Sequence, residues 1–202
     1  MRLFVIRHAQ PWLDPAVPPE QWRPAPEGVA ATRELVRRWS WHGVAAIHHS
    51  PQAKTEATGR VMADLLHVPL LAADDLAELA MDAGFLGDEA FADRVGAFLE
   101  GGRDPAFEDY DRARQRITAC VTRLMVGAAG RDLAIVSHGR IITVLFSALT
   151  GERLGRKEWQ SIAIPDLSLV DFGAGRVTAG FFAGRGIRHP GSLGSRPPQA
   201  FP

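Results

Sequence analysis

The chain has little cysteine, no net charge and no long apolar run, and each shortage excludes a class of protein. Its 202 residues include one cysteine, Cys120, which excludes an internal disulfide framework and a cysteine-based zinc site. Basic and acidic side chains both number 23, so overall charge favours neither nucleic acid nor a membrane surface as partner. No stretch approaches the roughly 20 apolar residues of a membrane span. With no signal-peptide pattern at its start, we expect a cytoplasmic protein.

The composition is that of an ordinary soluble globular protein, with 46% hydrophobic and 23% charged residues. This length suits one substantial domain. The last segment differs, because residues 183–202 are rich in glycine, proline and arginine and contain no acid. We therefore predict a domain over residues 1–182 followed by a flexible tail over residues 183–202.

Apolar runs alternate with segments of helical spacing along the predicted domain. Strands are predicted at 1–6, 44–47, 68–71 (an edge strand), 132–136, 161–164, 167–172 and 176–182, and helices at 27–39, 54–66, 89–99, 104–127 and 141–149. The alternation predicts an α/β fold: a single three-layer domain in which a mainly parallel sheet is flanked by helices on both faces. Residues 11–26 are rich in proline and include Trp12 and Trp22, so we expect a loop that packs over part of the domain.

Two of the predicted strands lead into a histidine, which places two candidate catalytic side chains at one edge of the sheet. The opening strand runs into Arg7 and His8, and the strand at 132–136 runs into His138. The carboxyl ends of parallel strands share an edge, where ligands bind in open α/β sheets. His138 also precedes a helix, whose first turn offers unpaired N–H groups, and Lys54 lies in the first turn of another helix. Together these groups predict a pocket for a phosphoryl dianion.

These stretches, in this order, resemble the motifs of the histidine phosphatase superfamily, the phosphoglycerate-mutase-like fold. Members of that family open with a strand running into Arg-His-Gly-Glu, carry Ser-Ser-Pro-x-x-Arg-Ala at the second strand-to-helix turn, and have Ser-His-Gly after a late strand. The matching stretches, which span most of residues 1–150, are Arg7-His8-Ala9-Gln10, His49-Ser50-Pro51-Gln52-Ala53-Lys54-Thr55 and Val136-Ser137-His138-Gly139.

The resemblance implies a role for each matching residue. His8 is the expected nucleophile, which forms a phosphohistidine that water then hydrolyses. Arg7, Lys54 and His138 are expected to hold the phosphoryl oxygens and stabilise the transition state. This chemistry requires no metal and no cofactor, and its partner is a small phosphorylated substrate.

The leaving group also needs a proton, and the resemblance directs attention to a Leu-x-Glu segment after the second helix. The segment Leu76-Ala77-Glu78-Leu79 is similar, which makes Glu78 the candidate general acid. The alternative interpretation of Glu78 is an exposed helical glutamate, and Asp75 and Asp82 are the nearby substitutes.

Several positions depart from the family's pattern. Lys54 replaces an arginine, which exchanges a bidentate fork for a point charge. Arg140 is a candidate to compensate, or else a solvent-facing helix residue. Gln10 and Ala9 replace the usual glutamate and glycine, and His49 occupies a serine position where it is a candidate for the rim of the pocket.

The leading hypothesis is therefore a metal-independent phosphomonoesterase, similar to histidine acid phosphatases. A phosphoglycerate-type mutase ranks below it, because the chain lacks large insertions and an extra basic cluster for a carboxylated substrate. The third hypothesis is a catalytically weakened phosphate-binding or regulatory module, which the lysine at position 54 keeps open. The sequence leaves the identity of the ester and the oligomeric state open.

Overall fold

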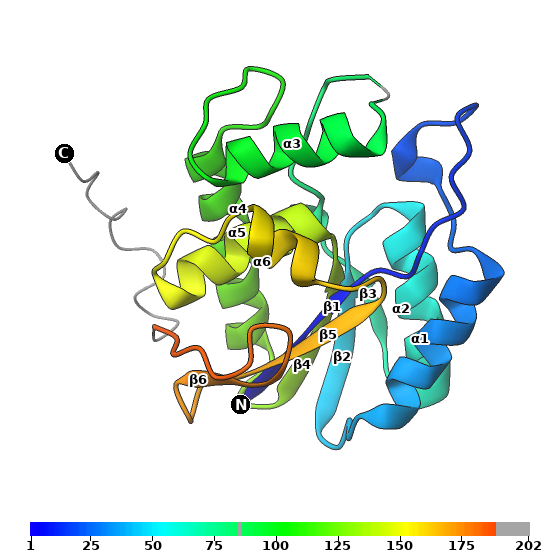
Figure 1. The fold of residues 1–202 in the computed structure, drawn as a ribbon. Helices are drawn as coiled ribbons and strands as arrows, with labels where there is room; N and C mark the ends of the chain where they lie inside the picture. The colour runs from blue at the N-terminus through cyan, green and yellow to red at the C-terminus, as the bar shows by residue number, and fades with distance from the viewer. Residues whose placement is uncertain (85, 189–202) are drawn as a thin grey trace.

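A six-stranded sheet with the order β3-β2-β4-β1-β5-β6 forms the centre of the computed structural model, which describes residues 1–84 and 86–188. The strands are β1 (Arg2–Arg7), β2 (Val44–His49), β3 (Leu70–Ala72), β4 (Asp132–Ser137), β5 (Asp166–Asp171) and β6 (Arg176–Gly180). The first four in this numbering pair in parallel, whereas β5 pairs antiparallel with β1 and β6 (Figure 1). The predicted mainly parallel sheet is confirmed.

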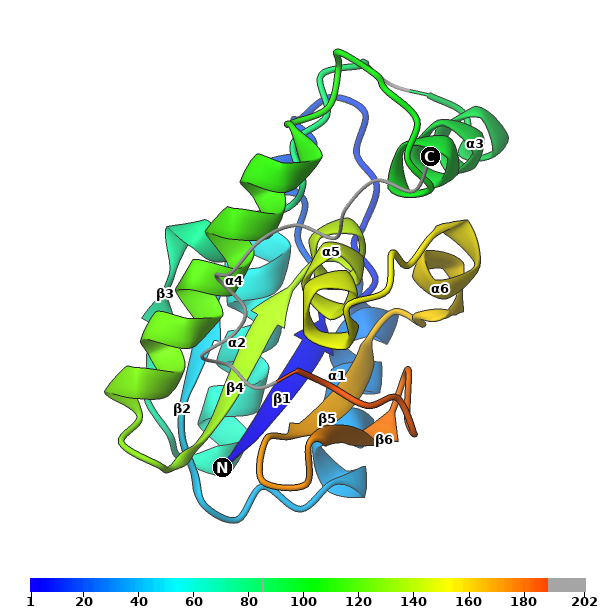
Figure 2. The same cartoon turned by 90° about the vertical axis from the view of Figure 1, so that its left-hand side faces the viewer.

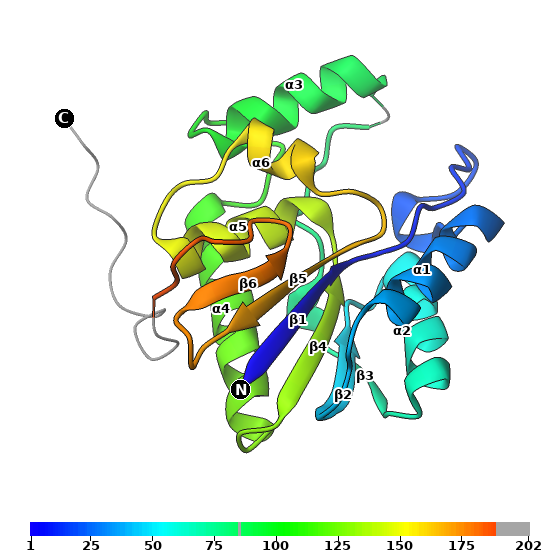
Figure 3. The ribbon, with the colours of Figure 1, turned by 60° about the horizontal axis from the view of Figure 1, so that its bottom comes forward.

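Helices cover both faces of this sheet, which confirms the predicted three layers. The helices are α1 (Pro26–Arg38), α2 (Ala53–Leu66), α3 (Asp88–Leu99), α4 (Tyr110–Gly127), α5 (Gly139–Thr150) and α6 (Arg156–Ser161), with single 3₁₀ turns η1 (Pro19–Gln21) and η2 (Asp74–Leu76). Helices α1 and α2 lie on one face, and α4 and α5 on the other (Figure 3). Helix α3 lies beyond the carboxyl ends of the parallel strands (Figure 2). In the described ranges, no helix is long and apolar enough to cross a membrane.

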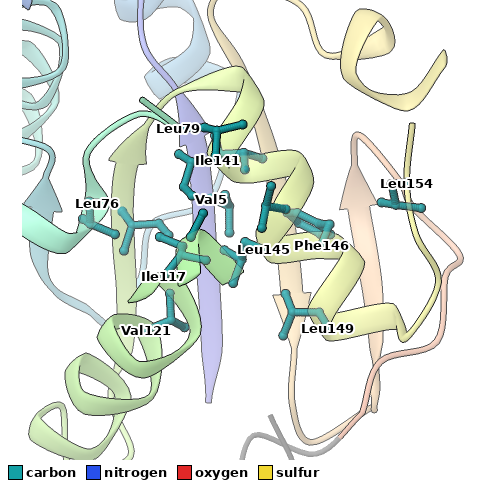
Figure 4. Close-up of a cluster of buried hydrophobic side chains, with 14 of the residues drawn as sticks. Val5, Leu76, Leu79, Ile117, Val121, Ile141, Leu145, Phe146, Leu149 and Leu154 are labelled. Atoms are coloured by element: carbon teal, nitrogen blue, oxygen red, sulfur yellow. The ribbon is translucent and has the colours of Figure 1, made fainter. Parts of the chain in front are cut away.

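One apolar run in β1 serves two hydrophobic cores, because successive side chains of a strand point to opposite faces of the sheet. Val5 belongs to the larger core, where it joins Ile117 of α4 and Leu145 of α5 (Figure 4). Phe4 and Ile6 belong to the smaller core, under α1 and α2. The central strand is thereby fixed from both sides, and so are the residues that follow it.

Two predicted elements differ from the structure by more than two residues, and helix α6 was not predicted. The helix predicted from residue 104 begins at Tyr110, because the Asp109 side chain accepts the backbone N–H of Arg112 at 2.9 Å and caps the helix there. The strand predicted at 161–164 was wrong, since these residues end α6 and connect it to β5. Ile162 is 2% exposed, so its apolar side chain serves the core rather than a strand pair. A short apolar run does not by itself distinguish these outcomes.

Residues 183–188, the start of the predicted tail, are hydrogen-bonded to the domain. The backbone N–H of Ile187 donates to the carbonyl of Gly175 at 2.8 Å, and that of Arg188 donates to Leu149 at 2.7 Å. The rest of the predicted flexible tail, 189–202, lies outside the described residues.

Replacing Phe146 by alanine should destabilise the fold by roughly 3–5 kcal/mol, because the ring is fully buried in the larger core. The control is Val126→Ala on α4, where the side chain is 77% exposed and the change should be within about 0.5 kcal/mol. Urea denaturation of both variants measures the free energies of unfolding. Similar losses in the two variants would contradict this description of the core.

Candidate active site

Parallel pairing of β1 with β4 brings the two strand-end histidines together. Arg7 lies opposite Ser137 in the register, and the backbone N–H of His8 donates to the carbonyl of Ser137 at 3.0 Å. The rings of His8 and His138 lie edge to face, with their centroids 5.1 Å apart. Both residues are buried. Two imidazoles that are 130 positions apart in the chain therefore share one buried site.

The tautomer of His8 follows from its hydrogen bond. Its Nδ1 lies 2.8 Å from the backbone carbonyl oxygen of Ala9. A carbonyl oxygen only accepts, so Nδ1 carries the proton and Nε2 carries the lone pair. Burial lowers the pKa of His8 to about 4; the hydrogen bond to Ala9 opposes this, and the cations of Lys54 and Arg7 reinforce it. The ring is therefore neutral at neutral pH, as a nucleophile must be.

Helices α1 and α2 hold the turn that carries His8. The backbone N–H of Ala9 donates to Thr58 Oγ1 of α2 at 3.0 Å, and that of Ala25 donates to the carbonyl of Gln10 at 2.9 Å. Gly28 of α1 lies so close that a Cβ there would come within 2.5 Å of the Gln10 carbonyl oxygen. The exposed Gln10 thus contributes its backbone carbonyl to this packing.

Arg7 lies flat against the start of α5. Its Nη1 donates to the carbonyl of Ile162 at 2.5 Å, and a Cβ at Gly139 would lie 2.9 Å from its Cζ. Its Nε is buried and has no hydrogen-bond partner among the described residues. Burial lowers the pKa of Arg7, while Glu78 and Asp166 raise it. The guanidinium remains a cation at any physiological pH.

His138 precedes α5 as its N-cap residue and is fully buried. Its Nε2 lies 2.8 Å from Ser50 Oγ, and its Nδ1 has no partner within residues 1–84 and 86–188. Burial lowers the pKa of His138 well below its usual value, although Glu78 raises it. Ser50 received no role from the sequence. It directly follows β2, as the two histidines directly follow β1 and β4, and its place in the matching stretch from His49 to Thr55 was the signal that could have found it.

Lys54 lies under the proline-rich loop. Its Nζ donates to the carbonyl of Pro19 at 2.9 Å and lies 5.8 Å from the centre of a Trp22 ring. Burial lowers the pKa of Lys54. The loop therefore packs over part of the domain, as predicted, and it does so at Lys54 through Pro19 and Trp22. Trp12 takes no part in this packing and is 66% exposed.

Glu78 lies in an irregular segment at the N-terminus of α5 and is not an exposed helical residue. Its Oε1 accepts the backbone N–H groups of Leu79 and Ile141, each at 2.9 Å, and its Oε2 lies 3.2 Å from Nε of Arg140. Burial raises the pKa of Glu78, but Arg140, His138 and the two N–H groups outweigh it and lower the pKa to about 2. Arg140 is accordingly an ion-pair partner rather than a solvent-facing residue.

The remaining candidates contact other parts of the fold or are exposed. His49 packs on α2, where its Cβ would be 3.6 Å from a Cβ at Gly59, and Asp75 pairs with Arg123 at 2.8 Å. Asp82 is exposed. In the part of the chain that the structure describes, no three histidine, cysteine, aspartate or glutamate side chains form a group that could hold a metal ion.

The sequence profile of the histidine phosphatase superfamily (branch 1) matches residues 3–180. The chain therefore belongs to the histidine phosphatase superfamily, which confirms the resemblance noted in its motifs. A comparison with curated proteins returned no match.

Solved structures share the fold at low sequence identity. YhfR of Bacillus stearothermophilus is 16% identical with a TM-score of 0.69, over 84% of this chain and 90% of its own. Phosphoserine phosphatase of Entamoeba histolytica, solved with 3-phosphoglyceric acid, is 15% identical with a TM-score of 0.71, over 89% and 96%. Phosphoglycerate mutase of Bacillus anthracis is 16% identical with a TM-score of 0.66, over 83% and 86%. The fold thus serves both phosphatases and a mutase.

The buried environment of His8 predicts an unusual titration. Its ring should protonate near pH 4 rather than near 6.5, as followed by NMR of the ring carbons. Between these values the unfolded chain binds more protons at this position than the folded one, so folding stability should fall as the pH falls, by about 1.4 kcal/mol per unit at most. Titration of His8 near 6.5 would contradict its burial beside two cations.

Proposed function

We propose that this protein is a metal-independent phosphomonoesterase, of the histidine acid phosphatase type, in which His8 accepts the phosphoryl group of a small phosphate ester. The observation that carries this proposal is the hydrogen bond between His8 Nδ1 and the Ala9 carbonyl, at 2.8 Å in a buried site. It fixes the tautomer that leaves the Nε2 lone pair available for attack on phosphorus. The family to which the chain belongs supports the same chemistry.

Donors surrounding His8 suit a phosphoryl group. The Nε of Arg7 and the Nδ1 of His138 are buried polar atoms that have no acceptor among the described residues, and phosphoryl oxygens are acceptors only. When Ser50 donates its hydroxyl hydrogen to Nε2 of His138, Nδ1 holds the ring proton and donates to the substrate. Lys54 uses one of its three hydrogens on Pro19 and can offer the others to the phosphoryl group.

The first step is attack of His8 Nε2 on phosphorus, with cleavage of the ester P–O bond. Its low pKa keeps the Glu78 carboxylate ionised, and a phosphoryl group beside it raises that pKa. A substrate monoanion brings a proton, since phosphate monoesters have a second pKa near 6. Glu78 takes this proton and delivers it to the leaving oxygen. An alcohol and a phosphohistidine result.

The second step returns the enzyme to its starting state. The Glu78 carboxylate removes a proton from a water molecule, whose oxygen attacks phosphorus as the P–N bond breaks. The electron pair of that bond returns to Nε2 of His8, and inorganic phosphate leaves with the proton. Arg7 and His138 stabilise the charge on the equatorial oxygens in both steps.

A hollow of about 680 Å³ adjoins the segments of Lys54 and Glu78 through their chain neighbours Ala53 and Ala77. It lies between η1, the start of α2 and Ala77, which precedes Glu78. Its charged lining consists of Glu20, Glu56 and Arg23. Two carboxylates and one guanidinium suit a phosphoglycerate poorly, because a mutase must hold the additional carboxylate of that substrate through two transfers.

The protein should release phosphate from p-nitrophenyl phosphate in the presence of EDTA. His8→Ala should lower kcat by about a thousandfold or more, because it removes the group that forms the covalent intermediate. The exposed His42→Ala is the control and should retain wild-type activity.

Retained activity in His8→Ala would refute the mechanism. Binding of phosphate by the wild-type protein without any hydrolysis would instead support a phosphate-binding module. Isomerisation of 3-phosphoglycerate faster than its hydrolysis would support a mutase.

A further inference from the structure

The irregular segment that carries Glu78 is held by an arginine from a different layer of the fold. We infer that Arg116 of α4 is a positioning residue for Glu78, the proton carrier of the proposed reaction. This inference rests on the proposed function, and it concerns the segment on which Glu78 lies rather than any contact with the substrate.

All five N–H groups of the Arg116 guanidinium have an acceptor. Nη1 donates to the backbone carbonyls of Asp75 at 2.8 Å and Ala77 at 3.0 Å, and Nη2 reaches the carbonyl of Glu78 itself at 3.5 Å. Nε and Nη2 donate to the two carboxylate oxygens of Glu108, at 3.0 and 2.8 Å. One planar group therefore binds three carbonyls around Glu78 and is itself fixed by a bidentate ion pair.

Glu108 closes this arrangement from the other side. Its backbone N–H donates to the carbonyl of Ala80 at 3.0 Å, and its carboxylate accepts the backbone N–H of Ala80 at 3.4 Å. The side chains of Arg116 and Glu108 are only 20% and 15% exposed. Partial burial strengthens a charge-assisted pair of this geometry relative to an exposed one.

The segment of residues 77–80 needs such support because it makes no regular pattern of backbone hydrogen bonds. Residues 77–80 belong to neither a helix nor a strand, so no ladder of backbone hydrogen bonds sets the position of Glu78. The Glu78 carboxylate is held by Leu79, Ile141 and Arg140, and its backbone is held by Arg116. A displacement of about 1 Å of a catalytic group can cost a hundredfold in rate.

A misplaced proton carrier affects esters unequally. p-Nitrophenolate is a weak base that leaves with little protonation, whereas an alkoxide needs its proton during bond cleavage. Loss of the Arg116 support should therefore slow an alkyl phosphate more than an aryl phosphate. A general loss of folding would slow both equally.

The test compares kcat/KM of Arg116→Lys for glycerol 2-phosphate and for p-nitrophenyl phosphate. Lysine keeps the charge but lacks the planar fork, so it cannot bind Glu108 and the carbonyls together. We expect a loss about tenfold larger for glycerol 2-phosphate. Arg123→Lys is the matched control: it lies on the same helix, pairs with the Asp75 side chain and is 62% exposed. It should change either substrate by less than about twofold.

Equal losses with the two esters would overturn the inference while leaving the proposed function intact. Failure of the wild-type protein to hydrolyse either ester would refute the proposed function itself. If Arg116→Lys does not fold, as judged by circular dichroism, Glu108→Gln replaces it. That variant keeps the size of the side chain but removes its charge, and the same bias against the alkyl ester is expected.

Discussion

Parallel pairing of β1 with β4 is the constraint on which the rest of the site depends. The pair sets Arg7 opposite Ser137, so the residue after each strand is a histidine at the same edge of the sheet. Apolar side chains on both faces of β1 hold this register, because a shift by one residue would reverse which side chains reach each core. Packing in the two hydrophobic cores thus fixes which side chains lie at this edge of the sheet.

Burial then determines the charge of each group at that edge. It keeps His8 and His138 neutral, whereas Arg7 remains a cation despite its lowered pKa. Glu78 is the opposing charge, and Arg140 together with the first turn of α5 keeps it ionised. Two buried polar atoms beside the neutral His8 imidazole, Arg7 Nε and His138 Nδ1, have no partner among the described residues, and in the proposed mechanism a phosphoryl group binds them. The Glu78 carboxylate can lie beside the proposed phosphoryl site because its charge is bound by Arg140 and by the backbone N–H groups of Leu79 and Ile141.

Local patterns in the sequence predicted the two parallel strands that run into His8 and His138, and therefore the sheet edge that these histidines share. They also predicted a loop over the domain, but not that its Pro19 carbonyl would bind Lys54. The role inferred for Arg116 was out of reach, because the backbone carbonyls that it binds lie 38 to 41 residues away and its spacing is that of any helical arginine. The strand predicted at 161–164 was wrong because its backbone geometry also depends on contacts with distant parts of the chain. An apolar run predicts that its side chains are buried, but whether the backbone forms a strand, a helix or a connection depends on the surrounding packing.

Covalent transfer of the phosphoryl group to Nε2 of His8 is the central step of the proposed mechanism, and trapping that intermediate tests it most directly. The protein is mixed with a ³²P-labelled phosphate ester and quenched in alkali, which preserves phosphohistidine, and the labelled peptide is identified. The account predicts label on His8 that is lost in acid and absent from His8→Ala. Hydrolysis of the ester with no label on His8 under rapid quenching, or label on another residue, would contradict it.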